Sequence, residues 1–284
     1  MQQTIAKELK IEGEGLHSGK KSTLIIKPAD VNTGIVFIRT DINDANPIPA
    51  IYTNVINTKN CTCIGHNETN IVSTIEHLMA ALYMMQIDNA IVEINAPEMP
   101  ILDGAAQTFF KKMQEIGVIR QNSPRKYIKV LKRVSIADDK GNTISLEPSE
   151  NFHVNFVIEF PSKIVGRQEF DGDINQEIFI KEIAPCRTFC EKYQIDYLRS
   201  IGLIKGGSLE NSVVLDGENI LNPEGFKVKN ECVNHKVLDA IGDMYTAGYP
   251  IKGRLTAKRT GHFHNNQILQ TLFADSSNYI IEEE

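Results

Sequence analysis

His235 and Asp239 stand four residues apart in a stretch with the apolar pattern of a helix, over 231–246. Side chains at positions i and i+4 of a helix share one face, so both can reach one metal ion. Neighbouring Leu238 and Ile241 give this helix an apolar side for packing. Such a pair alone is more often an exposed hydrogen bond than a metal site, so a second element is needed.

Another histidine, His77, lies beside Glu76 near the start of a second predicted helix, over 73–85. The rest of that helix is apolar, and burying an adjacent charge and imidazole is costly unless they are paired or coordinated. If the two helix starts face each other, His77, His235 and Asp239 offer two nitrogens and one oxygen. Three ligands with an open fourth position are typical of catalytic zinc. The alternative is an N-terminal helix acid beside a core histidine.

Nearby residues suit acid–base catalysis. Glu76 can act as a general base on a bound water, whose pKa a metal lowers to about 7. Asp243, further along the helix that carries His235, can orient His262 and keep it cationic, because a neighbouring negative charge favours protonated imidazole. His264 follows two residues later and, if this segment is a strand, points the other way and is exposed.

Two parts of the chain resemble each other. Residues 23–30 and 143–150 both read as a strand, a proline, a small residue and an acid, at an offset of 120 residues. The two histidine-bearing helices are offset by 158 residues, so the second half needs an insertion of about 38 residues. Residues 187–207, with an expected helix over 193–201 and a Gly-Gly turn, are the natural place. The alternative is that short matches arise by chance.

The duplication predicts an α+β fold of two similar domains, each with strands followed by a helix that begins near a histidine. We expect the first domain over residues 1–122 and the second over residues 123–284. The boundary falls in 121–124, which is a polar and turn-prone stretch.

Composition and charge narrow the class of protein. The 284 residues are 42% hydrophobic and 23% charged, which suits a globular core, and the net charge is −6 with dispersed basic residues. A nucleic-acid binder needs a positive face, so that class is disfavoured. The N-terminus has no apolar signal segment, and no apolar stretch approaches the ~18–20 residues that span a bilayer. We therefore expect a cytoplasmic protein without stable membrane insertion. Nothing in the sequence demands a dimer, so we expect a monomer.

The five cysteines are odd in number, which argues for reduced thiols in a chain without an export signal. Two pairs, Cys61 with Cys63 and Cys186 with Cys190, could in principle form a four-thiolate zinc site. Their spacings differ from those of structural zinc modules, so plain buried thiols are the expected reading.

Seven short motifs follow one another in order: Gly15–Lys20, Ser73–Leu78, Asn95–Gly104, Arg187–Phe189, Gly206–Ser208, His235–Asp243 and Gly261–His262. Together they resemble the UDP-3-O-acyl-N-acetylglucosamine deacetylases, the zinc enzymes of the committed step in lipid A synthesis. The resemblance runs along almost the whole chain. It implies two β-α-α-β domains with a central helical layer, the site between them, and inserts near 52–66 and 187–207.

The resemblance also implies roles for individual residues. His77, His235 and Asp239 would bind zinc, although ferrous iron is an open alternative because these ligands suit several divalent metals. The catalytic residues implied are Glu76 as base, Thr188 for the oxyanion, His262 as acid, Asp243 as the partner of His262, and Lys236 for a substrate oxygen or phosphate.

An acylated UDP-amino sugar needs further surfaces. An acyl chain requires an apolar passage, and the second insert offers Ile195, Leu198, Ile201 and Leu203. At helical spacing such residues are more often core, and the sequence alone does not separate the two. The substrate contacts implied by the resemblance are Leu16, His17, Cys63, Phe160, Phe189, Ile195 and Gly207.

Two other readings remain open at this point. A different zinc amidohydrolase would share the metal chemistry but lack an acyl passage. A non-enzymatic binding module would use the histidines only as structural residues.

Overall fold

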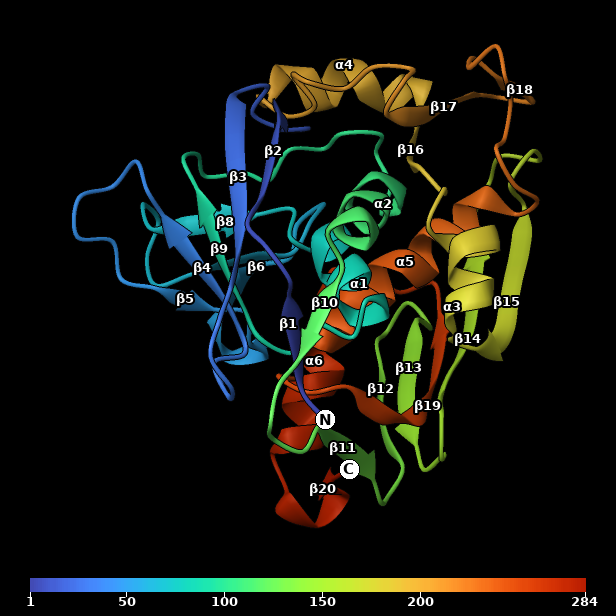
Figure 1. The fold of residues 1–284 in the computed structure, drawn as a ribbon. Helices are drawn as coiled ribbons and strands as arrows, with labels where there is room; N and C mark the ends of the chain where they lie inside the picture. Colours follow the sequence, from blue (N-terminus) through green and yellow to red (C-terminus); the bar gives the residue numbers. More distant parts are fainter.

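Two β-sheets flank a central layer of helices in the computed structural model, which describes residues 1–284 (Figure 1). The sheet of the first half lies on the left of Figure 1 and the sheet of the second half on the right. This arrangement confirms the predicted α+β class. No helix is both long enough and apolar enough to cross a membrane.

The first half forms a five-stranded sheet. Its strands, in spatial order, are β2 (Leu9–Glu14), β3 (Lys21–Pro28), β9 (Ala90–Ile94), β4 (Ile35–Arg39) and β5 (Ile48–Pro49). Its helices are α1 (Glu76–Met84) and α2 (Gln107–Ile116). The first insert holds a short 3₁₀ turn (Tyr52–Asn54) and a small sheet of β6 (Val55–Asn57), β7 (Cys63–Gly65) and β8 (Ile71–Ser73), so it extends beyond the predicted 52–66.

The second half forms a seven-stranded sheet. Its main path is β12 (Val134–Ala137), β13 (Thr143–Glu147), β19 (Ile251–Lys258), β11 (Lys126–Val130) and β20 (Tyr279–Glu283), with β14 (Phe152–Glu159) beside β19 and β15 (Arg167–Asp173) beside β14. Its helices are α3 (Gln176–Ile178), which continues into a π-helical turn (Phe179–Ile183), α5 (Glu231–Tyr245) and α6 (His262–Phe273), which is followed by a 3₁₀ turn (Ser276–Asn278).

The second insert and one further strand pair complete the fold. The insert contains β16 (Thr188–Glu191), α4 (Lys192–Ser200), β17 (Ser212–Asp216) and β18 (Asn219–Ile220), so the helix predicted over 193–201 is confirmed. In Figure 1, α4 lies at the top of the molecule, above the helical layer. The remaining strands, β1 (Gln3–Ile5) and β10 (Val118–Arg120), pair antiparallel.

The two halves repeat one topology. In the first, β9 runs antiparallel to β3 and parallel to β4. In the second, β19 runs antiparallel to β13 and parallel to β14. Each of these three-strand units is joined to two helices, α1 and α2 or α5 and α6. The repetition supports the predicted duplication, whereas the exact boundary between two domains stays a prediction.

Helices α1 and α5 form the centre of the molecule because they are buried on nearly all sides. Every residue of α1 except Tyr83, and every residue of α5 except Lys236, is buried. Helices that are covered all round belong in a core rather than on a surface. A Cβ added to Gly242 of α5 would lie 2.0 Å from the backbone oxygen of Glu76 of α1. The glycine therefore lets the two helices touch where their histidines meet.

The segment that begins at His262 is a helix, so the strand considered for His264 does not form. Strand β19 ends at Lys258, Arg259 has a left-handed φ of 54°, and α6 begins at His262. Apolar residues at helical spacing later in this segment pack α6 into the core. His264 is consequently half-buried, with Nε2 3.3 Å from a carboxylate oxygen of Asp138, and the expectation of an exposed side chain was wrong.

Candidate metal centre and its pocket

Three buried side chains of α1 and α5 converge between the two halves. Nε2 of His77 lies 3.6 Å from Oδ1 of Asp239, and Nε2 of His235 lies 3.4 Å from the same oxygen. Ligand atoms about 2.1 Å from one ion in a tetrahedral arrangement stand about 3.4 Å apart. The three atoms therefore have the spacing of donors around one divalent cation.

The hydrogen bonds of these side chains also suit a metal ion. Nδ1–H of His235 donates to the carbonyl oxygen of Cys186 at 3.1 Å, which leaves the Nε2 lone pair free. Burial lowers the pKa of His235 to about 3, so its imidazole is neutral. Oδ1 of Asp239 is buried without a hydrogen-bond partner, which is costly unless a cation binds there. These residues fit a divalent metal, and no cysteine belongs to the group.

Lys236 pairs with the second carboxylate oxygen of Asp239. Its ammonium donates to Oδ2 of Asp239 at 2.5 Å. Burial by itself would favour the neutral acid, yet the imidazole of His235 and the ammonium of Lys236 hold the pKa of Asp239 well below its usual value. Asp239 is therefore charged, with Oδ1 directed to the histidines and Oδ2 to the lysine.

His262 and Glu76 form a second group beside the first. Nε2 of His262 lies 4.0 Å from Oε1 of Glu76 and 3.9 Å from Oδ2 of Asp239, while its Nδ1–H donates to Asp243 at 2.8 Å. Burial disfavours the charged imidazole, but these carboxylates outweigh it and raise the pKa of His262 to about 9. A cationic imidazole has no lone pair to offer a metal, so the group of His77, His235 and Asp239 is the better candidate of the two for a divalent ion.

Glu76 begins α1 and faces the same space. Its side chain is 3% exposed, and burial raises the pKa of its carboxyl above the usual value. Two residues earlier, Thr74 has a φ of 61°, a conformation that is rare for a β-branched residue. Backbone strain of this kind concentrates at functional sites, where the surrounding structure holds it in place.

A buried ion pair holds Thr188 in the wall of the cavity beside the candidate metal group. Nε of Arg187 donates to Oε1 of Glu231 at 2.9 Å, and the guanidinium also pairs with Glu224. Glu231 is the first residue of α5, and its Oε1 accepts the backbone N–H of Arg187 at 3.0 Å. These contacts fix the start of β16, and with it Thr188, to the first turn of the helix that carries His235.

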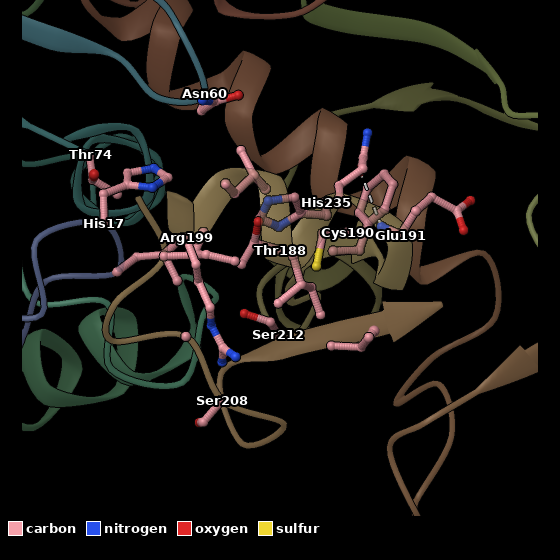
Figure 2. A pocket seen from close by; sticks show the side chains of 18 of the residues that line it. His17, Asn60, Thr74, Thr188, Cys190, Glu191, Arg199, Ser208, Ser212 and His235 are labelled. Carbon is pink, nitrogen blue, oxygen red and sulfur yellow. Dashed lines mark hydrogen bonds between the residues drawn. The ribbon is translucent and has the colours of Figure 1, made fainter. Parts of the chain in front are cut away.

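A cavity of about 690 Å³ opens onto these residues, with walls from both halves. His17 from the first half and His235 from the second both face it (Figure 2). Its aromatic wall holds Phe160 and Phe189, whose ring centroids lie 5.3 Å apart. Its apolar wall comes from the second insert and contains Ile195, Leu198, Ile201, Ile204, Leu209, Val214 and Leu221. The cavity thus joins the polar centre to an apolar surface.

Comparison with known proteins agrees with this geometry. Residues 2–274 match the family model described as UDP-3-O-acyl N-acetylglycosamine deacetylase. This chain belongs to that family. Proteins named UDP-3-O-acyl-N-acetylglucosamine deacetylase from Shewanella pealeana (strain ATCC 700345 / ANG-SQ1) and Shewanella oneidensis (strain ATCC 700550 / JCM 31522 / CIP 106686 / LMG 19005 / NCIMB 14063 / MR-1) are 45% and 46% identical to it. Each alignment covers 275 residues, 96% of this chain and 90% of the relative.

In this member of the deacetylase family, most of the predicted substrate contacts line the cavity, together with two of the predicted catalytic residues, Thr188 and Lys236. They are Leu16, His17, Phe160, Thr188, Phe189, Ile195, Gly207 and Lys236. Cys63 does not line it: its side chain is buried in the small sheet, with 4% exposure. Leu203 is also absent from the lining, and Asp243 lies behind His262, where it can act only through that imidazole.

Sequence reasoning missed several residues that shape this deacetylase-family site. Glu98, which lies within the motif Asn95–Gly104 and had no predicted role, accepts the backbone N–H groups of His17 and Ser18 at 2.7 Å each. Thr62 and Asn265 both donate to Asp243. The sequence carries little signal for them, because Thr62 stands between two cysteines in an insert and its partner is 181 residues away.

Proposed function

We propose that this chain hydrolyses the acetamide of UDP-3-O-acyl-N-acetylglucosamine to acetate and UDP-3-O-acyl-glucosamine, the committed step of lipid A biosynthesis. The observation that carries the proposal is one constellation. A metal-type group of two histidines and an aspartate adjoins a buried glutamate and a cationic histidine, at a cavity with an apolar wall. The family membership and the names of the relatives support the same reaction.

His77, His235 and Asp239 would hold a divalent ion, for which we propose Zn²⁺, with Fe²⁺ as the alternative that the same donor set accepts. When bound, such an ion supplies positive charge that polarises a carbonyl and acidifies water. Glu76 accepts the proton of the attacking water. The Thr188 hydroxyl donates to the developing oxyanion, a type of contact worth about 3–4 kcal/mol in other amide hydrolases.

His262 completes the reaction as the acid. Its Nε2 faces the space between Glu76 and Asp239, and its Nδ1 is held by Asp243. It therefore carries a proton that it can donate to the leaving nitrogen of the sugar. Lys236 adds a cation at the cavity wall, where it can bind a substrate oxygen when it is not paired with Asp239.

The cavity walls suggest how the rest of the substrate binds. Phe160 and Phe189 would pack against the sugar or nucleotide, and His17 with Leu16 would contact the polar head. The acyl chain would lie along the half-buried Ile195 and Leu198 of α4. We propose a cytoplasmic location, which five free cysteines support, and a monomer, because one chain supplies every residue of the constellation.

The test is acetate release from UDP-3-O-acyl-N-acetylglucosamine by the wild type, Glu76→Gln and Glu93→Gln. Glu93 lies on β9 and pairs with Lys27, away from the cavity. We expect Glu76→Gln to lower kcat by about 10²- to 10⁴-fold and Glu93→Gln to leave it unchanged. Full activity in Glu76→Gln would remove the assigned base, and a wild type that releases no acetate would remove the proposed reaction.

A further inference from the structure

Thr62 is hydrogen-bonded both to Glu76, the proposed base, and to Asp243, which holds the proposed acid His262, although Thr62 lines no part of the cavity. It lies in the first insert directly before β7 and is 2% exposed. Its hydroxyl oxygen lies 2.5 Å from Oδ1 of Asp243. Because a carboxylate can only accept, the hydroxyl is the donor. Its backbone N–H donates to Oε2 of Glu76 at 3.0 Å.

The backbone contact fixes the orientation of the Glu76 carboxylate. With Oε2 bound to the N–H of Thr62, the other oxygen, Oε1, is the one that faces Nε2 of His262 at 4.0 Å. No other hydrogen bond holds this carboxylate, so the single N–H decides which oxygen is presented to the reaction space.

The side-chain contact completes the hydrogen bonding of Asp243. Its Oδ2 already accepts Nδ1–H of His262 and Nδ2–H of Asn265, each at 2.8 Å. Its Oδ1 accepts from the Thr62 hydroxyl, which also lies 3.3 Å from Nδ1 of His262. Without that hydroxyl, Oδ1 would be buried without a side-chain donor, and the carboxylate could rotate away from the imidazole.

We propose that Thr62 is a positioning residue that sets the base, Glu76, and the acid, His262, in one geometry from a single point of the first insert. This inference rests on the proposed function for its catalytic meaning. Thr62 does not line the cavity, so it acts only through the side chains that it contacts, which are Glu76, Asp243 and His262. The first insert therefore contributes to the position of the catalytic side chains.

The first test compares Thr62→Val with Thr62→Ser. Valine keeps the shape and the backbone N–H but removes the hydroxyl, whereas serine keeps the hydroxyl. We expect Thr62→Val to lower kcat by about 10- to 100-fold with KM changed less than about twofold, and Thr62→Ser to stay within about threefold of the wild type. Equal losses in both variants, or a fully active Thr62→Val, would overturn the proposal.

A matched control is Thr4→Val. Thr4 is also buried, and its hydroxyl donates to the backbone oxygen of Asn89 at 2.7 Å, outside the site. The Thr4→Val protein should have a lower free energy of unfolding and an unchanged kcat. In a protein that already carries Asp243→Ala, adding Thr62→Val should lower kcat by less than about a further twofold, because the hydroxyl acts through that carboxylate. Independent, additive losses would contradict this route.

A readout without turnover separates this inference from the proposed function. The proton on Nδ1 of His262 should give a downfield NMR signal in the zinc-loaded protein, identified by its loss in His262→Ala. We expect Thr62→Val to shift this signal and Thr4→Val to leave it in place. If the wild type released no acetate, a shifted signal would still support the positioning role, while an unchanged signal would overturn it whatever the activity.

Discussion

The proton that the surrounding carboxylates favour on His262 leaves His77, His235 and Asp239 as the group that we propose to hold a metal. The sequence indicated His235 and Asp239 because i, i+4 spacing is a local property, and His77 with Glu76 because they interrupt an apolar helix. Asp243 followed from its place on the helix of His235. The sequence carries no signal for Thr62, because its partner Asp243 is 181 residues away in the chain and only the folded structure brings the two together. Contacts between distant segments require the packed structure.

The same charge predicts the pH dependence of the reaction. His262 must hold its proton to donate it, so the rate should fall as pH rises through a pKa that the surrounding carboxylates raise to about 9 against the effect of burial. Glu76 must lose its proton, so it governs the acid limb, where the rate rises with pH. Asp243→Asn removes one of the carboxylates, lowers the pKa of His262, and should move the alkaline limb down by about 1 to 3 pH units.

The measurement is kcat/KM against pH for the wild type, Asp243→Asn and Asp171→Asn. Asp171 lies beside His153 on the exposed face of the second sheet, so its variant controls for loss of a carboxylate next to a histidine. An alkaline limb that stays in place in Asp243→Asn would contradict the role given to this pair.

At the level of elements, α4 has one face toward the cavity and one face toward solvent. Ile195 and Leu198 line the cavity, while Tyr193 is 76% exposed. The sequence predicted this helix from its apolar spacing but could not say whether the apolar side met core or cavity. The sequence placed His264 on the exposed side on the condition that its segment is a strand, whereas the apolar pattern that follows makes a helix.

Charge on the inner face of α4 should impair long-chain substrates selectively. Ile195→Glu places a carboxylate where the acyl chain would lie, and we expect kcat/KM for a long-acyl substrate to fall at least about tenfold. A short-acyl analogue should lose less than about threefold. Tyr193→Glu adds the same charge to the outer face and should change neither. Equal effects of Ile195→Glu on both substrates would rule out an acyl passage along this face.

At the level of the whole molecule, the site exists only where the two halves meet. The internal repeat in the sequence anticipated two similar units, and the repeated order of β3, β9 and β4 and of β13, β19 and β14 agrees with it. What the sequence could not give is the contact of α1 with α5, which depends on Gly242 having no side chain. That contact sets the distance between the histidines.

Gly242→Ala should therefore disturb the interface and the site together. The new Cβ would fall 2.0 Å from the backbone oxygen of Glu76, and we expect overpacking to lower the free energy of unfolding by about 1–3 kcal/mol, with a loss of kcat. Gly172→Ala is the control, since its Cβ would meet only the Phe170 ring at an ordinary 3.5 Å. Denaturant unfolding measures both, and a Gly242→Ala protein as stable and active as the control would show that the helices need no such close approach.

The central claim is that a divalent ion held between the halves drives amide hydrolysis. The most direct measurement is metal content together with acetate release from UDP-3-O-acyl-N-acetylglucosamine, for the wild type, His77→Ala and His66→Ala, the last being an exposed histidine outside the site. We predict a single bound ion and acetate release in the wild type and His66→Ala, and loss of both in a folded His77→Ala. A His77→Ala protein that keeps its ion and its turnover would contradict the account.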